Sequence, residues 1–163
     1  MPAGGEVESL VEEGKPAPDF ELTSDAGESV SLASLRGTPV VLYFYPKDFT
    51  MGCTREACSF RDNFEAISAA GATLLGVSAD DEASHARFRE RHDLPFRLLA
   101  DPARKVIDAY DARGMFGLGV ARVTYVIGRD GVIADAFRHE LLVSRHVPLV
   151  LEALARLPAA PAT

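Results

Sequence analysis

The sequence predicts a single α/β domain that is built on a mixed β-sheet with helices on both faces. Three observations predict it. Apolar, β-prone segments alternate with charged segments of helical periodicity along the chain. Residues 40–45 form a continuous apolar run between Pro39 and Pro46, as expected of a central strand that is covered on both faces. Two strand-like segments also meet at the turn-like residues 129–131, which adds an antiparallel hairpin near the end of the chain.

The first half of the chain supplies a hairpin, a central strand and a helix. Residues 20–22 and 30–32 flank the turn-like residues 24–27, which suggests a short hairpin. The buried strand 40–45 follows, and a loop leads from it into residues 54–69. This last segment is a predicted helix because apolar and small residues recur at helical spacing among charged ones: Ala57, Phe60, Phe64, Ile67 and Ser68.

The second half continues the alternation. Residues 72–78 are predicted to form a second buried strand, and residues 81–92 a charged helix with Asp80 as its N-cap. A strand at 96–100 and a short helix at 102–110 come next. The chain then closes with strands at 123–127 and 132–137 and with a helix at 144–157 whose N-cap is Ser144.

These elements outline a thioredoxin-like fold, although the pattern alone also permits other doubly wound folds. We expect the domain to span residues 14–157. Residues 1–13 are expected to be a flexible lead-in, and the Pro- and Ala-rich residues 158–163 a frayed tail.

Composition and charge exclude several classes of function. The chain has 163 residues, of which 47% are hydrophobic and 25% charged, as in ordinary soluble proteins. Its net charge of −7, without a dense basic run, disfavours nucleic acid and anionic membranes as partners. The N-terminus does not resemble a secretory signal, and no apolar stretch approaches the length of a membrane span. We therefore expect a cytoplasmic protein, in which two cysteines are more often catalytic or metal-binding than structural.

Cys53 lies where an α/β sheet gathers reactive groups, just after a central strand and at the start of a helix. A helix N-terminus favours the thiolate, which is the nucleophilic form of cysteine. The alternative is a small buried hydrophobe, but Thr50, Gly52 and Thr54 make the setting polar and tight. Cys58 follows five residues later, about 8.7 Å away in an ideal helix, so the two cysteines cannot form a disulfide while the helix is intact.

The segment from Pro46 to Cys58, PKDFTMGCTREAC, resembles the active-site segment of peroxiredoxins. The flanking runs Tyr43-Phe44-Tyr45 and Phe60-Arg61-Asp62 are similar to the bacterioferritin comigratory protein, or Q-type, subgroup. The resemblance extends from Gly14 to Leu157 and includes four further motifs: GKPAPDF at 14–20, LPF at 94–96, ADP at 100–102 and RVTYVI at 122–127.

The resemblance implies a thiol peroxidase that reduces hydrogen peroxide and organic hydroperoxides in antioxidant defence and redox homeostasis, with neither cofactor nor metal. Cys53 matches the peroxidatic cysteine, which attacks the peroxide and becomes a sulfenic acid. Thr50 matches the hydroxyl that binds thiolate and peroxide, and Pro46 the proline that shields the sulfur. Arg122 matches the arginine that stabilises the thiolate and polarises the O–O bond, although an arginine in a strand pattern is otherwise more often an edge residue.

Cys58 matches the resolving cysteine, which would form an intramolecular disulfide with Cys53 that a thioredoxin-type dithiol reduces. This cycle requires the first turns of the helix to unwind, and a structural role for Cys58 is the alternative. We expect a monomer or a weak dimer. Glu56 is either a partner in the site or a first-turn acid that interacts with the helix dipole. Met51 departs from the subgroup, which usually has proline there, so the loop should be less rigid.

Three other functions are less consistent with the sequence. A zinc site is disfavoured because the four histidines and two cysteines lack ligand spacing. A thioredoxin-type disulfide oxidoreductase normally needs Cys-x-x-Cys, whereas four residues separate Cys53 from Cys58. A peroxide sensor is compatible with a reactive cysteine, but Pro46, Thr50 and Arg122 favour turnover.

Overall fold

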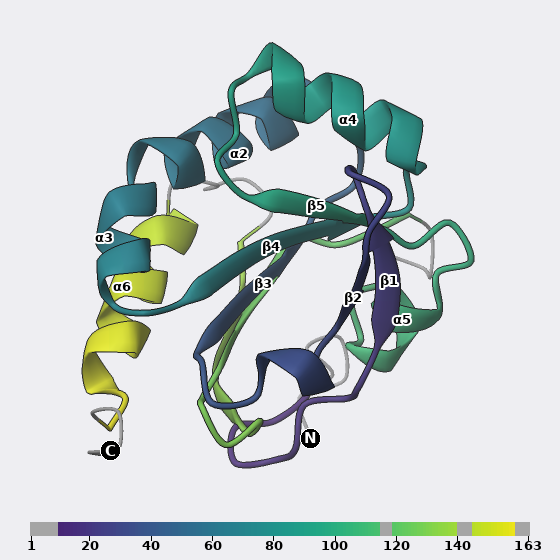
Figure 1. Cartoon of the computed structure of the whole chain (residues 1–163). Helices are drawn as coiled ribbons and strands as arrows, with labels where there is room; N and C mark the ends of the chain where they lie inside the picture. The colour runs from purple at the N-terminus through teal and green to yellow at the C-terminus, as the bar shows by residue number, and fades with distance from the viewer. Residues whose placement is uncertain (1–9, 115–118, 140–144, 159–163) are drawn as a thin grey trace, which may run out of the picture.

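The computed structural model describes residues 10–114, 119–139 and 145–158, and its centre is a seven-stranded sheet (Figure 1). The strand order is β2-β1-β5-β4-β3-β6-β7. The strands are β1 (Glu21–Ser24), β2 (Ser29–Ser31), β3 (Val40–Phe44), β4 (Thr73–Ser78), β5 (Arg97–Ala100), β6 (Val123–Ile127) and β7 (Ile133–Arg138). The helices are the short 3-10 helix η1 (Ala33–Leu35), α2 (Met51–Asp62), α3 (Phe64–Ala69), α4 (Glu82–Arg91), α5 (Lys105–Ala109) and α6 (His146–Arg156).

The sheet is mixed. Strands β3, β4 and β5 pair in parallel at its centre, and the remaining strand pairs are antiparallel. Parallel neighbours need a crossover, which α2 and α3 supply between β3 and β4, and α4 supplies between β4 and β5. The sequence prediction of a mixed sheet in a thioredoxin-like arrangement is confirmed.

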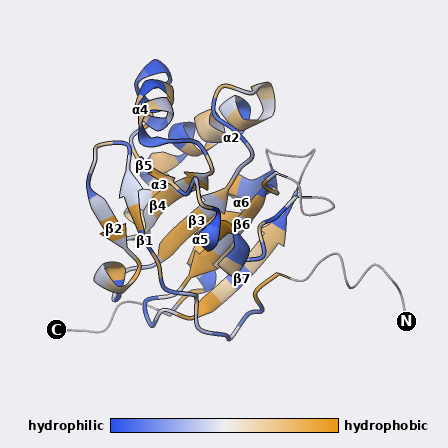
Figure 2. Cartoon of the chain, turned by 90° about the vertical axis from the view of Figure 1, so that its right-hand side faces the viewer, coloured by the Kyte–Doolittle hydropathy of each residue, from blue (hydrophilic) through white to orange (hydrophobic). Residues whose placement is uncertain are grey.

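Strand β3 separates two apolar cores because its side chains alternate between the faces of the sheet. Val40, Leu42 and Phe44 pack in the core that α5 covers. Val41 and Tyr43 pack in the core that α2, α3, α4 and α6 cover. Figure 2 shows the apolar strands of the sheet enclosed between more polar helices. Helices therefore lie on both faces, as the sequence predicts.

The predicted helix at 54–69 is wrong in two respects. It begins three residues earlier, at Met51, because Thr50 is extended and serves as the N-cap. It is also broken at Asn63, between α2 and α3. The Asn63 side chain donates to the carbonyl of Ser59 at 2.8 Å, which is the acceptor that a continuous helix would use for the backbone N–H of residue 63.

Two other helix starts differ from the prediction. The N-cap of α4 is Asp81 and not Asp80, since the Asp81 carboxylate accepts from the N–H of Ser84 at 2.8 Å. The helix predicted at 102–110 is shorter and begins at Lys105, because Arg104 has a left-handed backbone with φ of 61°. The predicted cap Ser144 lies outside the described residues, and the domain limits at 14 and 157 stay predictions.

Candidate active site

Cys53 lies in the first turn of α2, beyond the carboxyl end of the central strand β3. Its side chain is 1% exposed and packs in the core beneath α2, beside Tyr43 and Ala57. The helix has 12 residues, so the positive end of its dipole and its unpaired N–H groups favour negative charge in this turn. The predicted placement of Cys53 at a helix start is therefore correct, with the start two residues before it.

Arg122 directly precedes β6, the strand that pairs with β3, and its side chain reaches Cys53. Strand β6 is antiparallel to β3 and pairs Val123 with Phe44, so the residue before β6 lies beside the end of β3. Arg122 Nη1 donates to Cys53 Sγ at 3.1 Å, and the arginine side chain is 13% exposed. A cation at this distance, largely shielded from water, stabilises a thiolate strongly.

Gly52 makes this approach possible. A Cβ atom at residue 52 would lie 2.6 Å from Arg122 Nη2, which is closer than nonbonded atoms allow. The guanidinium therefore lies directly against the backbone of the first turn of α2. Only glycine leaves that space free.

Glu56 holds Arg122 from the second turn of α2. Its carboxylate is 1% exposed and lies 3.4 Å from Arg122 Nη1 through Oε1, and 3.5 Å from His146 Nε2 through Oε2. His146 is fully buried at the start of α6, where its Nδ1 lies 2.7 Å from the hydroxyl of Thr124. Glu56 is thus a partner in the site, which the sequence left open. The sequence indicates His146 only as one of four histidines that could bind a metal, because no local pattern predicts its contact with α2.

Tyr43 contributes a neutral group to the same environment. Burial raises the pKa of its hydroxyl well above the usual value of 10, and the negative charges of Glu56 and Cys53 raise it further. The phenol stays protonated, so it adds no second negative charge near the thiol. Its ring stacks on Phe60 with the ring centroids 4.5 Å apart, which fixes the last turn of α2 on the sheet.

Thr50 and Pro46 bound the loop that leads into α2. The Thr50 hydroxyl donates to the carbonyl of Lys47 at 2.8 Å, so its lone pairs are left to accept a hydrogen bond from a ligand. Pro46 is half-buried. Phe49 and Met51 are 50% and 78% exposed, and Phe49 has a left-handed backbone with φ of 67°. A non-glycine residue in that conformation is strained by roughly 1–2 kcal/mol.

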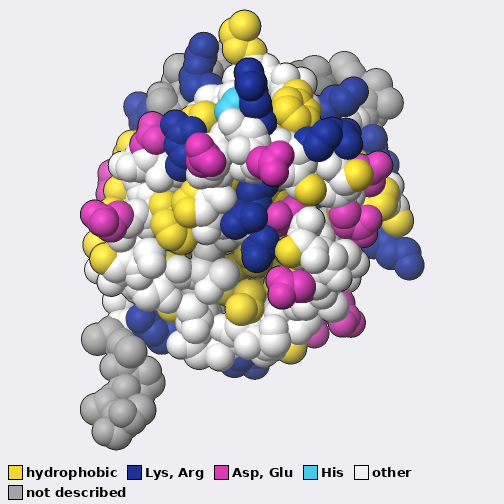
Figure 3. Space-filling model, turned by 45° about the horizontal axis from the view of Figure 1, so that its top comes forward, with side chains coloured by type: hydrophobic (Ala, Val, Ile, Leu, Met, Phe, Trp, Pro, Cys, Tyr) yellow, Lys and Arg dark blue, Asp and Glu magenta, His cyan; other side chains and the backbone are white. Residues whose placement is uncertain are grey.

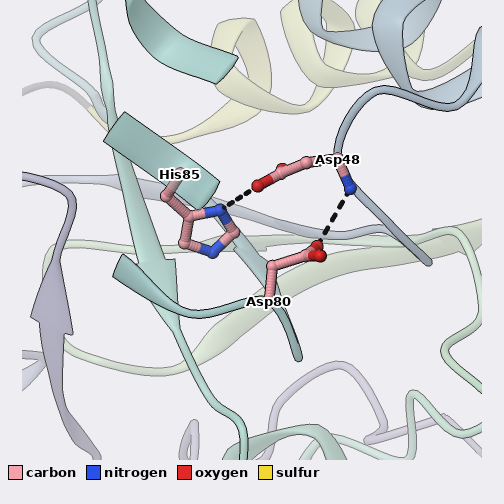
Figure 4. Close-up of side chains that lie close together, drawn as sticks. All are labelled: Asp48, Asp80 and His85. Carbon is pink, nitrogen blue, oxygen red and sulfur yellow. Dashed lines mark hydrogen bonds and ion pairs between the residues drawn. The ribbon is translucent and has the colours of Figure 1, made fainter. Parts of the chain in front are cut away.

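A polar network anchors this loop through Asp48 (Figure 4). The Asp48 carboxylate is buried and accepts from Tyr45 at 2.6 Å and from Ser84 at 2.8 Å, and it lies 2.7 Å from Nδ1 of the buried His85. Its backbone N–H donates to Asp80 at 2.9 Å. The ligand atoms of Asp48, Asp80 and His85 lie within 4.8 Å of one another, as in a metal site. Since hydrogen bonds already engage them, the arrangement fits a loop anchor.

Cys58 lies farther along α2, half-buried, and both cysteines are free thiols. Its Sγ lies 4.0 Å from Nδ1 of His92, the C-cap residue of α4. The helix is continuous from Met51 to Asp62, so Cys53 and Cys58 are on different sides of an intact element.

The profile of the AhpC/TSA family matches residues 13–136. The chain belongs to this family. It is 42% identical over 150 residues to Peroxiredoxin Bcp of Bacillus subtilis, which covers 88% of this chain and 95% of that protein. It is 41% identical over 151 residues to the chloroplastic Peroxiredoxin Q of Arabidopsis thaliana, covering 92% and 70% respectively.

Solved structures agree. Peroxidoxin BcpB from Mycobacterium tuberculosis superimposes with a TM-score of 0.84 at 33% identity, over 91% of this chain and 99% of that one. The chain is therefore a peroxiredoxin of the Bcp and Q type and a thiol-dependent peroxidase with the two cysteines of the atypical 2-Cys class.

Among the helices in the described ranges, none is long and apolar enough to cross a bilayer.

Proposed function

We propose that Cys53 is the peroxidatic cysteine and Cys58 the resolving cysteine of a cycle that a thioredoxin-type dithiol completes. The observation that carries the first half is the 3.1 Å hydrogen bond from Arg122 to Cys53 Sγ in the first turn of α2. The Cys53 thiolate attacks one oxygen of a hydroperoxide, the O–O bond breaks, and sulfur gains that oxygen as a sulfenic acid. The other oxygen leaves as an alkoxide or hydroxide and takes up a proton.

Three residues assist this step. Arg122 stabilises the thiolate and then the negative charge that develops on the peroxide oxygens. Thr50 accepts the hydrogen bond of the peroxide O–H, because its own proton is donated to Lys47. Pro46 shields the sulfur and, without an N–H, offers no competing donor.

The second step joins the cysteines and regenerates the enzyme. The Cys58 sulfur attacks the sulfenic sulfur of Cys53, the S–O bond breaks, and water leaves. The first turns of α2 must unwind for this, since a disulfide needs Cα atoms about 4.4–6.8 Å apart. A reductant dithiol then reduces the bond by exchange. We further propose that the protein acts in the cytoplasm as a monomer or weak dimer.

Mass spectrometry of single-cysteine variants tests the assignment. After wild type is treated with one equivalent of peroxide, the peptide that contains Cys53 and Cys58 should be 2 Da lighter than in the reduced protein, since disulfide formation removes two hydrogens. Cys58→Ser should stop at a sulfenic acid that dimedone traps on Cys53, and Cys53→Ser should not consume peroxide. Full thioredoxin-dependent turnover by either variant would refute the assigned role of that cysteine.

A further inference from the structure

The contact between Cys58 and His92 places a base beside the second sulfur. His92 Nδ1 lies 4.0 Å from Cys58 Sγ, within hydrogen-bond range for sulfur. The position is fixed from two sides. Arg61 of α2 donates to the His92 carbonyl at 2.8 Å, and the imidazole packs edge-on against Phe88 with the ring centroids 5.1 Å apart.

The surroundings of His92 keep it available as a base. Burial lowers the pKa of its imidazole below the usual 6.5, and the positive charges of Arg91 on α4 and Arg61 on α2 lower it further. Figure 3 shows Lys and Arg side chains interspersed with acidic ones on the face of the molecule that carries α2 and α4. At neutral pH the ring is therefore uncharged, and Nδ1 can take a proton from the thiol when Nε2 carries the ring proton.

Contacts on either side of Cys53 limit how much of the loop and of α2 can unwind in the resolving step. Asp48 is anchored before Cys53 by the network with His85, and Phe60 is fully buried after it. If unwinding is confined to residues 49–57, Cys53 moves, whereas Cys58, two residues before the buried Phe60, keeps its place near α4. The disulfide can then form beside His92.

We propose that His92 is the general base for the resolving step, a role that rests on the proposed function of Cys58. The Cys58 S–H bond breaks and its proton passes to His92 Nδ1. The thiolate attacks Cys53 Sγ, so an S–S bond forms and the S–O bond of the sulfenic acid breaks. The hydroxide that leaves takes the proton from the imidazolium and departs as water, so that Cys58 is oxidised, Cys53 is reduced, and His92 is restored.

The size of the effect is limited by the chemistry of thiols. A free cysteine is already about 3% thiolate at pH 7, so a base that removes its proton accelerates attack by at most about 30-fold. We expect His92→Gln to form the disulfide roughly 10-fold more slowly at pH 7. The deficit should become small near pH 9, which is above the pKa of an ordinary cysteine thiol.

Single-turnover rapid quench separates this proposal from the proposed function. The reaction is quenched with dimedone and a maleimide, and mass spectrometry then gives the sulfenic acid and the disulfide against time. His92→Gln should form the sulfenic acid at the wild-type rate and slow only the disulfide. If Cys53 formed no sulfenic acid in wild type, the proposed function would fail; a disulfide rate unaffected by His92→Gln at every pH would overturn the role of His92 alone.

Two arginine variants give a readout that a structural role would not move. Arg91 lowers the pKa of His92, so Arg91→Gln should raise the midpoint of the disulfide rate against pH. Arg87, exposed one turn earlier on α4, is the matched control, and Arg87→Gln should leave the profile in place. A His92→Gln deficit that is equal at pH 7 and pH 9, or an Arg91→Gln profile identical to that of Arg87→Gln, would overturn the proposal.

Discussion

Gly52 provides a direct test of the contact between Arg122 and Cys53. In Gly52→Ala the new methyl group would lie 2.6 Å from Nη2 and 3.2 Å from Cζ of Arg122. The guanidinium is the flexible end of its side chain, so it moves and the fold does not. That movement weakens the 3.1 Å hydrogen bond to Cys53.

The magnitude follows from the loss of one hydrogen bond to a charged group, which is about 1.5–3 kcal/mol. Sulfenic acid formation should therefore slow by about 10- to 150-fold. The free energy of unfolding should not fall, because alanine is favoured over glycine within a helix by up to about 1 kcal/mol. Activity and stability are thus expected to change in opposite directions.

Rapid quench measures the second-order rate constant of sulfenic acid formation, and urea unfolding of the same samples measures the free energy of unfolding. Ser59→Ala is the control, since it introduces alanine elsewhere on α2 at a half-buried position. In an Arg122→Ala background the effect of Gly52→Ala should vanish. A rate within twofold of wild type, or an undiminished effect in that background, would refute the reasoning.

Three further outcomes are expected. Met51 is the first residue of α2, and the ψ of 154° at Thr50 suits a residue before proline. Met51→Pro should therefore raise the free energy of unfolding in urea by about 0.4–1 kcal/mol, and a lower urea midpoint than that of wild type would contradict this. Asp48→Ala leaves the hydroxyls of Tyr45 and Ser84 without their acceptor and should cost about 1–3 kcal/mol for each buried group left unpaired, against under about 0.5 kcal/mol for the exposed Asp62→Ala. Equal losses would argue against the loop anchor. The native pKa of His92 is lowered from 6.5, so the unfolded chain takes up that proton more readily and wild-type stability declines as pH falls through about 6.5. Between pH 7 and pH 5 the free energy of unfolding, measured by urea titration, should therefore fall less in His92→Gln than in wild type. Parallel curves of this free energy against pH would contradict the prediction.

The fold was largely predictable because its signals are local. The apolar run of β3 and the alternation of strands and helices fixed the sheet and placed Cys53 at its edge. The helix break at Asn63 was missed because it depends on one side-chain hydrogen bond to Ser59. Such a bond competes with the backbone only by a small margin, so apolar periodicity continues across it.

The site was less predictable because its contacts are not local. Arg122 is 69 residues from Cys53, and only the antiparallel pairing of β6 with β3 brings it there, so the family resemblance was needed to find it. His85 lies 37 residues from Asp48, and His146 meets Glu56 across α2 and α6. A buried histidine among charged or apolar residues carries no pattern of its own, which is why only a three-dimensional arrangement reveals its partner.

The left-handed backbone of Phe49 bears on how the enzyme withstands its own substrate. Strain of roughly 1–2 kcal/mol next to α2 is released when the loop and the first turns open, which favours the open form by about 5- to 30-fold. An open form removes the sulfenic acid from the peroxide pocket and delivers it to Cys58. A second peroxide then has less time to convert it to the irreversible sulfinic acid. In the proposed cycle, the left-handed backbone of Phe49 would therefore shorten the time during which the Cys53 sulfenic acid is exposed to a second peroxide.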